Sequence, residues 1–271
     1  MSHFQTPTVL PASYTDPESD AESLKKAMKG LGCDEDAIIK VLTDKNTEQR
    51  LQIVHEYEAL FKKDLIKELQ KELSGNFEDT VVALMTPAYE FLASELKRAV
   101  KGAGTDEDTL VLLSILAASK QDPKASPSSV ASQLCAVDAK GKIALDSDTL
   151  RTVMVSYSRP FLYNVFKEYE TITEQPFSNL IKKVSSGDAR NALTAIYRGI
   201  VSLPTFFAEE LQAAFKGLGT KDRKLIRIVV SRAEVDLEDV KQAFSDLYGK
   251  SLEKEVQVRN NLKFELRNDV I

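Results

Sequence analysis

The chain repeats one short loop three times: Lys29-Gly30-Leu31-Gly32, Lys101-Gly102-Ala103-Gly104 and Lys216-Gly217-Leu218-Gly219. Each copy follows a stretch with helical spacing of apolar residues and precedes residues that favour the start of another helix. Because glycine adopts positive φ without strain, two glycines one residue apart let several backbone carbonyls point toward one position. A hard cation such as Ca²⁺ prefers oxygen ligands of this kind. The repetition predicts an array of similar helical repeats with candidate Ca²⁺ loops.

Apolar residues at helical spacing predict five helices in the first repeat. The first helix is expected to end at Met28, the second to run from about residue 34, and the third to start near Thr47. Ser74-Gly75-Asn76 separates the fourth helix from the fifth, and Pro87 closes the repeat. Nowhere does the sequence sustain the alternation of apolar and polar residues that is typical of a strand. We therefore predict an all-α fold.

The pattern of the first repeat recurs twice more with recognisable landmarks. Tyr57 and Ser74-Gly75 correspond to Tyr169 and Ser186-Gly187 of a later repeat, and Tyr57 also corresponds to Phe244 of the last one. Where the later repeat should carry its loop stands Lys142-Ile143-Ala144-Leu145, so we expect that loop to be degenerate. We predict an N-terminal tail at 1–14, a complete first repeat at 15–87, a shortened second repeat with a linker at 88–129, a third repeat at 130–202 and a C-terminally truncated fourth repeat at 203–271.

Composition restricts the partners of this chain. The 43% hydrophobic and 28% charged residues are typical of a folded protein, and the formal net charge of −5 argues against nucleic acid and against polybasic docking on a membrane. Cys33 and Cys135 are too few for a disulfide framework, and the N-terminus lacks a signal-peptide pattern, so we expect a cytoplasmic location. With His3 and His55 as the only histidines, a zinc site is not expected.

Glycine loops of this form, set in four repeats of up to five helices, resemble those of the annexin family, and the resemblance covers nearly the whole chain after residue 15. It implies an array of four five-helix repeats, the second one incomplete, forming a curved disc with Ca²⁺ loops on its convex face. It also implies that the protein binds acidic phospholipid membranes peripherally when Ca²⁺ is raised. The tail at 1–14 would then lie on the opposite face.

The resemblance also implies a main Ca²⁺ site in the first repeat. The carbonyls of Met28, Gly30 and Gly32 would line one side, and the Glu72 carboxylate would close the other. Since Ca²⁺ takes 6–8 oxygens, water or a lipid phosphate would complete the shell. Weaker secondary sites would pair the Cys33 carbonyl with Glu35 and the Leu73 carbonyl with Glu78. The remaining loops would offer weak or incomplete sites, with ligands drawn from Val100, Gly102, Gly104, Thr105, Glu107, Phe215, Gly217, Gly219 and Asp222.

Two corresponding positions have lost the closing carboxylate. Val184 and Arg259 occupy the place of Glu72 in the third and fourth repeats, and the matching segment of the second repeat is absent. We therefore expect one complete site, with a phosphate contact by Arg259 as a further hypothesis. Cys33 occupies the position at which Thr105 and Thr220 are expected to cap the following helix in their repeats. We therefore expect the helix that follows Cys33 to start with a weaker cap.

Three classes of function compete. Ca²⁺-dependent membrane binding is favoured by the repeated loops together with Glu72, although a glycine after a helix is also an ordinary helix terminator. The alternative is a helical scaffold with little or no Ca²⁺ binding, which contacts a partner protein through its tail or concave face. An enzyme is not expected, because the sequence has neither a histidine beside a recognisable nucleophile nor a phosphate-binding motif. Self-association on the membrane would raise avidity.

Overall fold

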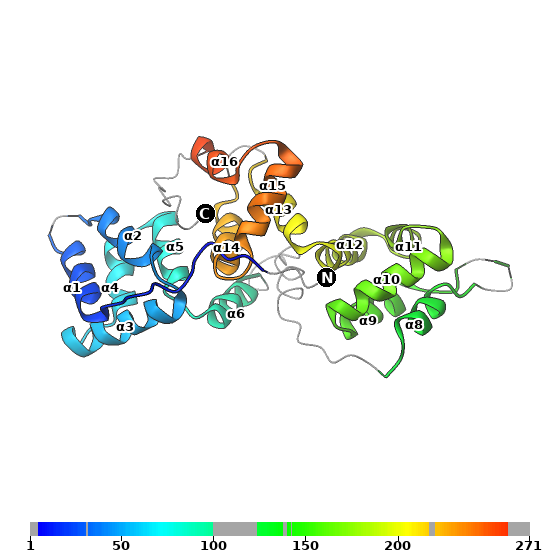
Figure 1. Cartoon of the computed structure of the whole chain (residues 1–271), viewed down its shortest axis with the longest axis horizontal. Helices are drawn as coiled ribbons and strands as arrows, with labels where there is room; N and C mark the ends of the chain where they lie inside the picture. Colours follow the sequence, from blue (N-terminus) through cyan, green and yellow to red (C-terminus); the bar gives the residue numbers. More distant parts are fainter. Residues whose placement is uncertain are drawn as a thin grey trace. The chain divides into compact units, whose positions relative to one another are not determined.

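The structure is a computed structural model that describes residues 5–30, 32–99, 124–137, 140–141, 143–216 and 220–259, without the side chains of Leu96, Ala99 and Arg259. Every named element in these ranges is an α-helix (Figure 1). The one β feature that the described residues show is an isolated bridge between Val137 and Ile143. The all-α prediction is therefore confirmed. None of the described helices is long and apolar enough to cross a membrane.

The first repeat forms five helices, as its apolar spacing predicts. Polar side chains fix several helix starts: Asp34, Asn46 and Asp64 each accept a hydrogen bond from a backbone N–H of the following turn. The helices are α1 (Pro17–Ala27), α2 (Glu35–Thr43), α3 (Thr47–Phe61), α4 (Leu65–Glu72) and α5 (Gly75–Leu84).

The corresponding later helices reproduce this frame. They are α8 (Pro127–Leu134), α9 (Ser147–Ser156), α10 (Arg159–Thr173), α11 (Phe177–Val184) and α12 (Gly187–Val201). Lys62 and Glu174, which follow α3 and α10, both have a left-handed backbone with φ of 54°. The remaining named helices are α6 (Ala88–Ala99), α13 (Leu203–Ala214), α14 (Asp222–Ala233), α15 (Leu237–Tyr248) and α16 (Leu252–Arg259).

One local expectation was wrong. The residue that caps α2 is Asp34, whose carboxylate accepts from Ala37 N at 3.0 Å, and the corresponding position before α14 is Lys221, which makes no side-chain cap. Neither Cys33 nor Thr220 is the capping residue. The loop therefore runs one residue further than expected before its helix starts. The weakly capped start is that of α14, not that of α2.

The loop between α8 and α9 has a different construction from the first glycine loop. Its base closes through the bridge between Val137 and Ile143 and a hydrogen bond from Ala144 N to Ala136 O at 2.9 Å. Gly141, with φ of +73°, lies within it. This segment, expected to be a degenerate loop, has one glycine in place of the glycine pair of the first repeat, and it runs from Cys135 to Asp146 between its flanking helices.

Two compact units make up the chain, one from Met1–Ser94 with Phe207–Ile271 and the other from Glu95–Phe206. The first unit therefore combines the first and fourth repeats, and α14 packs against α5 within it (Figure 1). Its first-repeat core is a hydrophobic cluster around Leu24, Ile53 and Tyr57. The second unit has its own core, in which the rings of Phe166 and Phe177 lie 4.2 Å apart between centroids.

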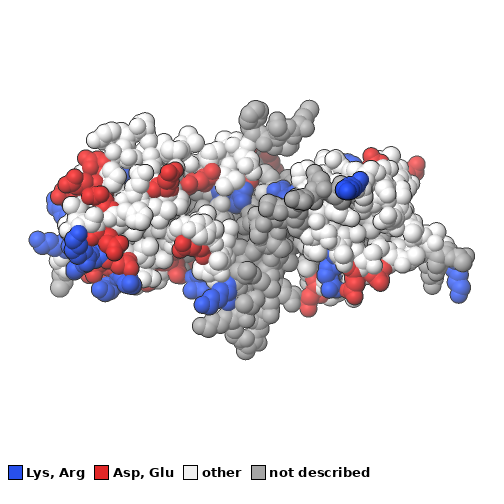
Figure 2. Space-filling view, turned by 90° about the horizontal axis from the view of Figure 1, so that it is seen from below, with Lys and Arg blue, Asp and Glu red and all other residues white. Residues whose placement is uncertain are grey.

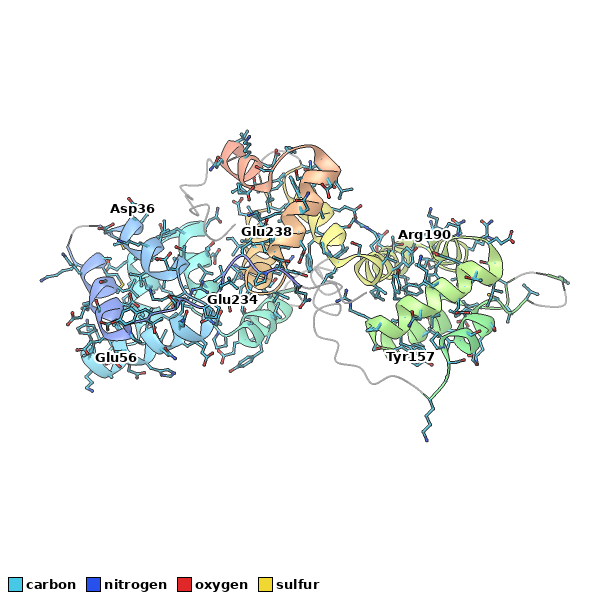
Figure 3. The ribbon with its side chains drawn as sticks, viewed as in Figure 1. Asp36, Glu56, Tyr157, Arg190, Glu234 and Glu238 are labelled. Atoms are coloured by element: carbon cyan, nitrogen blue, oxygen red, sulfur yellow. The ribbon has the colours of Figure 1, made fainter. Side chains whose placement is uncertain are left out.

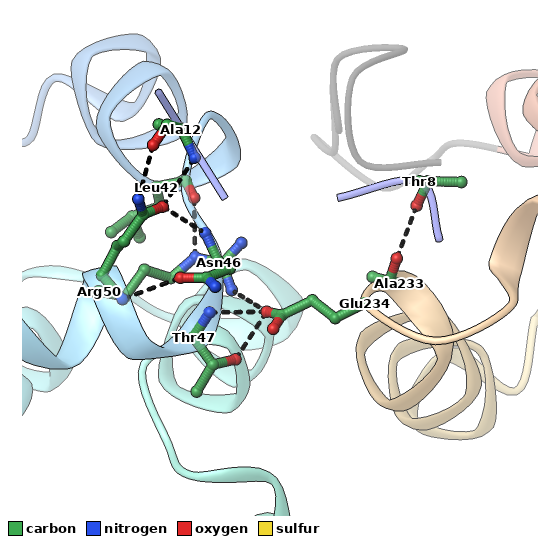
Figure 4. A network of polar contacts seen from close by, with 9 residues as sticks. Thr8, Ala12, Leu42, Asn46, Thr47, Arg50, Ala233 and Glu234 are labelled. Atoms are coloured by element: carbon green, nitrogen blue, oxygen red, sulfur yellow. Dashed lines mark hydrogen bonds and ion pairs between the residues drawn. The ribbon is translucent and has the colours of Figure 1, made fainter. Parts of the chain in front are cut away.

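A polar seam joins the first and fourth repeats (Figure 4). The Glu234 carboxylate accepts from Thr47 N and Oγ1 at 2.7 Å and from Arg50 Nη1 at 3.3 Å. Arg50 is 1% exposed and also donates through Nε to Leu42 O at 2.8 Å. Burial lowers the pKa of the Arg50 guanidinium to about 10, and the Glu234 charge opposes this shift.

The N-terminal segment crosses the same seam. Thr8 N and Val9 N both donate to Ala233 O, at 2.8 and 3.0 Å, and Thr6 O accepts from Glu238 N at 3.1 Å. Further along, Ala12 exchanges two backbone hydrogen bonds with the Gln49 side chain, each 2.9 Å long (Figure 4 draws these contacts). The segment thus binds helix ends of both repeats.

We expect Glu234→Ala to lower the free energy of unfolding by about 1–3 kcal/mol, because three donors lose one charged acceptor and the Arg50 guanidinium stays buried. Glu238→Ala is a matched control, since the Glu238 side chain makes an exposed ion pair with Lys241 that is worth less than about 1 kcal/mol. Urea unfolding measures both. Equal effects of the two substitutions would contradict this assignment.

Candidate calcium site of the first repeat

The loop between α1 and α2 has the backbone that the glycine pair predicts. Gly30 and Gly32 have φ of +118° and +93°, values that a residue with a side chain adopts only with strain. Asp34 N donates to Ala27 O at 2.9 Å and closes the base of the loop. A Cβ atom added at either glycine would meet nothing within 4 Å. The glycines are therefore required for the backbone conformation and not for close packing.

The carbonyl oxygens of this loop remain available. No hydrogen bond among the described residues ends on the carbonyl of Met28, Gly30 or Gly32, and both glycines are exposed. Backbone carbonyls left unpaired at an exposed loop can bind water or a cation. The geometry is compatible with the predicted ligand role of all three.

Glu72, the last residue of α4, supplies the carboxylate. It is exposed, and the described part of the chain gives its side chain no hydrogen bond or ion pair. The neighbouring lysines contact Glu68 instead: Lys63, Lys71 and Lys25 lie 3.1, 3.0 and 3.5 Å from its carboxylate. Hydrogen bonds from Lys71 and Lys63 lower the pKa of Glu68 to about 2. Because these lysines pair with Glu68, none of them forms an ion pair with Glu72 in the part of the chain that the structure describes.

The thiol of Cys33 shows that this carboxylate lies near the loop. Burial raises the pKa of Cys33, and the charges of Glu35, Glu72 and Asp34 raise it further. Cys33 is adjacent to Gly32 in the loop, whereas Glu72 ends a helix far along the chain. Tertiary packing therefore brings the Glu72 carboxylate within electrostatic range of the Cys33 thiol.

The predicted secondary ligands fall on the same end of the repeat. Glu35 is the first residue of α2, and Leu73 is the residue that follows α4. Glu78 lies in the first turn of α5 and is half-buried. Figure 3 labels Asp36 beside this end of α2 and Glu56 on α3, away from it.

The fourth repeat has the same loop closure, since Lys221 N donates to Ala214 O at 2.9 Å. Phe215, the predicted carbonyl ligand that follows α13, has a fully buried side chain. Asp222 accepts from Asn76 Nδ2 at 2.8 Å through Oδ2, while its Oδ1 is buried without a hydrogen-bond partner among the described residues. Arg223 contacts Asp79 at 3.2 Å. Asp222 thus contacts the α4–α5 turn of the first repeat.

Several predicted ligands lie outside the described residues, namely Val100, Gly102, Gly104, Thr105, Glu107, Gly217 and Gly219. Of Arg259 only the backbone is described. No group of three His, Cys, Asp or Glu side chains in the described ranges could hold a metal ion by itself.

Sequence reasoning missed two contributors to the site. Glu68 binds the lysines that would otherwise neutralise Glu72, and Asn76 connects the α4–α5 turn to Asp222. The spacing of Glu68 and Lys71, one turn apart on a helix, could have signalled the first contact. Nothing in the local sequence signals the second, because it joins residues of two repeats.

We predict that Glu72→Gln lowers the pKa of the Cys33 thiol, because one nearby negative charge is removed. Ca²⁺ added to the wild-type chain should lower this pKa in the same direction. Alkylation rate measured against pH, in a Cys135→Ser background, reports Cys33 alone. Glu56→Gln removes the same charge from α3 and should leave the pKa unchanged. An unchanged Cys33 pKa in Glu72→Gln would contradict the inference that the Glu72 carboxylate lies near the glycine loop.

Comparisons with known proteins identify relatives of this chain. The Annexin family model matches residues 19–84 and 206–261. Human annexin A4 is 39% identical over 291 residues, an alignment that covers 90% of this chain and 91% of annexin A4. Because that alignment is longer than the 271 residues of this chain, parts of annexin A4 lie opposite gaps here.

Solved structures give the same result for the fold. Annexin III matches with a TM-score of 0.87 and 30% identity, covering 98% of this chain and 95% of that chain. Chicken annexin V matches with a TM-score of 0.81 and 32% identity, covering 99% and 98%. The loop geometry, the repeated helical frame and these similarities show that the chain belongs to the annexin family.

Proposed function

We propose that the first repeat binds Ca²⁺ through the carbonyls of Met28, Gly30 and Gly32 and the carboxylate of Glu72, and that the bound ion bridges to the phosphate of an acidic phospholipid. The observation that carries this proposal is Glu72, a carboxylate without a partner among the described residues and close enough to the glycine loop to raise the pKa of Cys33. Membership of the annexin family, whose general property is Ca²⁺-dependent phospholipid binding, supports it.

Electrostatics explains why the first repeat needs a divalent cation to bind an acidic lipid. The chain has a net charge of −5, and the described basic side chains on the face drawn in Figure 2 form small groups interspersed with acidic ones. Such a surface offers no continuous basic field to an acidic membrane. A Ca²⁺ ion held by neutral carbonyls and one carboxylate leaves excess positive charge at the loop. That charge attracts a lipid phosphate and completes the coordination shell.

One complete site implies a modest intrinsic affinity. An exposed site with a single carboxylate belongs with weak Ca²⁺ modules, whose dissociation constants are on the order of 10⁻⁴–10⁻³ M without lipid. Lipid phosphate would tighten the site, and self-association of the protein on the membrane would add avidity. The secondary ligands Glu35 and Glu78 would contribute further oxygens on the same face of the repeat. We place the protein in the cytoplasm, bound peripherally to membranes when Ca²⁺ rises, with no enzymatic role.

We expect sedimentation with phosphatidylserine vesicles to require Ca²⁺ and Glu72→Gln to raise the Ca²⁺ requirement by about tenfold or more, because the site loses its one charged ligand. Glu56→Gln has the same net charge and should behave like the wild-type chain. Vesicles of phosphatidylcholine alone should not bind at any Ca²⁺ concentration used. Binding that ignores Glu72→Gln would move the site to another loop.

A second candidate function is favoured by the N-terminal segment. Leu10 and Tyr14 are 65% and 79% exposed, although Val9 between the two repeats is buried. Two large apolar side chains on an exposed segment suit contact with a partner protein. If folded protein fails to bind acidic vesicles at every Ca²⁺ concentration, this scaffold role replaces the membrane role.

A further inference from the structure

The first and third repeats present the same backbone turn between their last two helices. Leu73 and Ser185, which follow α4 and α11, are both extended, with ψ of 163° and 158°. Gly75 and Gly187, which start α5 and α12, both have positive φ, +65° and +55°. The two turns therefore direct their backbone carbonyls alike. In the first repeat the Leu73 carbonyl is a predicted Ca²⁺ ligand together with Glu78.

The side chains at the two turns have opposite charge. Val184 and Arg190 of the third repeat stand where the first repeat has Glu72 and Glu78. Arg190 donates to Ser185 O through Nε at 2.8 Å and through Nη2 at 2.6 Å, and Nη2 also donates to Lys182 O at 3.1 Å. The guanidinium of Arg190 therefore donates hydrogen bonds to the Ser185 carbonyl, which corresponds to the Leu73 carbonyl of the first repeat. A fixed internal cation stands where the first repeat would bind Ca²⁺.

The surroundings of Arg190 are basic as well. Lys182 and Lys183 form the last turn of α11 and are exposed, and the described residues give neither side chain an acidic partner. Nη1 of Arg190 likewise has no hydrogen-bond partner among the described residues. The side chain of Arg190, which Figure 3 labels, is half-buried. Residues 182–190 carry three cations against one carboxylate, that of Asp188, whereas 70–78 carry one cation, Lys71, against two carboxylates.

We propose that the turn at 182–190 binds the phosphate groups of a phosphatidic acid surface directly, without Ca²⁺, because a phosphate monoester carries more negative charge than the phosphate diester of phosphatidylserine. The exposed Lys182 and Lys183 and the half-buried Arg190 suit a surface that offers many phosphates, because each charge near such a surface adds its own attraction. A single free phosphate would need donors that converge around it. The local charge decides the contact, since charges beyond about 8–10 Å are screened at physiological salt.

The start of α12 adds to this attraction. Ser186, the residue before its first turn, makes no side-chain cap among the described residues, and the positive end of the dipole of this 15-residue helix lies at the same turn. The proposal goes beyond Ca²⁺ bridging because it needs no metal. It assigns the third repeat a role although it lacks both the glycine pair and the closing carboxylate.

Vesicle sedimentation in excess chelator tests the proposal. We expect the wild-type chain to bind phosphatidic acid vesicles there, and the double substitution Lys182→Gln/Lys183→Gln to weaken binding about fivefold for each charge removed. The matched control is Arg151→Gln/Lys167→Gln, which removes two exposed charges from α9 and α10 of the same repeat and should keep wild-type binding. Equal losses in the two double variants, or no binding by the wild-type chain in chelator, would overturn the proposal.

Two further measurements keep the outcomes distinct. Arg190→Gln, with circular dichroism to verify its fold, should also weaken chelator-resistant binding, and wild-type affinity in the folded variant would count against the proposal. Inorganic phosphate at millimolar concentration should not displace the protein from vesicles, and displacement would show a site for the free ion. Ca²⁺-dependent binding to phosphatidylserine in the same preparation reports on the Glu72 site separately, so the two proposals can fail independently.

Discussion

The buried guanidinium of Arg50 imposes the constraint on which the first compact unit depends. A charge with 1% exposure must be matched by acceptors inside the protein, and the acceptors are Leu42 O of its own repeat and Glu234 of the fourth. Glu234 can reach Arg50 and Thr47 only if the turn after α14 docks against the start of α3. The N-terminal segment and the contact between Asn76 and Asp222 then cross the same boundary, so that several polar bonds hold together repeats that lie at opposite ends of the chain.

That docking also defines the surroundings of the candidate Ca²⁺ site. Asn76 and Asp79, near the start of α5, contact Asp222 and Arg223 of the fourth repeat and so hold the α4–α5 turn in place. On the other side of this turn, Glu68 of α4 binds the nearby lysines. Glu72 is left as an exposed carboxylate without a described partner, next to a loop of unpaired carbonyls. A cation site of this kind has little affinity until a further ligand completes its shell, which explains why lipid phosphate and Ca²⁺ would bind together.

The first and third repeats show that two turns with the same backbone conformation can have side chains of opposite charge. The turns after α4 and α11 share their extended residues and their positive-φ glycine, because those features end one helix and start the next. Side chains at such an exposed turn contribute little to the core, so Glu78 and Arg190 can differ in charge without a change of fold. One turn thereby offers ligands to a cation, and the other supplies the cation itself.

The sequence by itself determined the helices and the loop backbone, because both follow from short-range signals. Apolar spacing defines the face that each helix buries, and Gly30 and Gly32 permit the positive φ values of the loop. The resemblance of the sequence to the annexin family supplied Glu72 as a candidate ligand, and the correspondence between repeats showed that Val184 and Arg259 replace it elsewhere. The sequence pattern placed the cap of α2 at Cys33, one residue too early. It does not show that the Asp34 carboxylate is the group that accepts a hydrogen bond from Ala37 N. Only the tertiary structure decided which charges are paired: Glu68 with its lysines, Asp222 with Asn76, and Glu234 with Thr47 at a separation of 187 residues. Such pairings form because packed helices bring together side chains that lie far apart in the sequence. A local sequence pattern does not specify which distant side chains will meet.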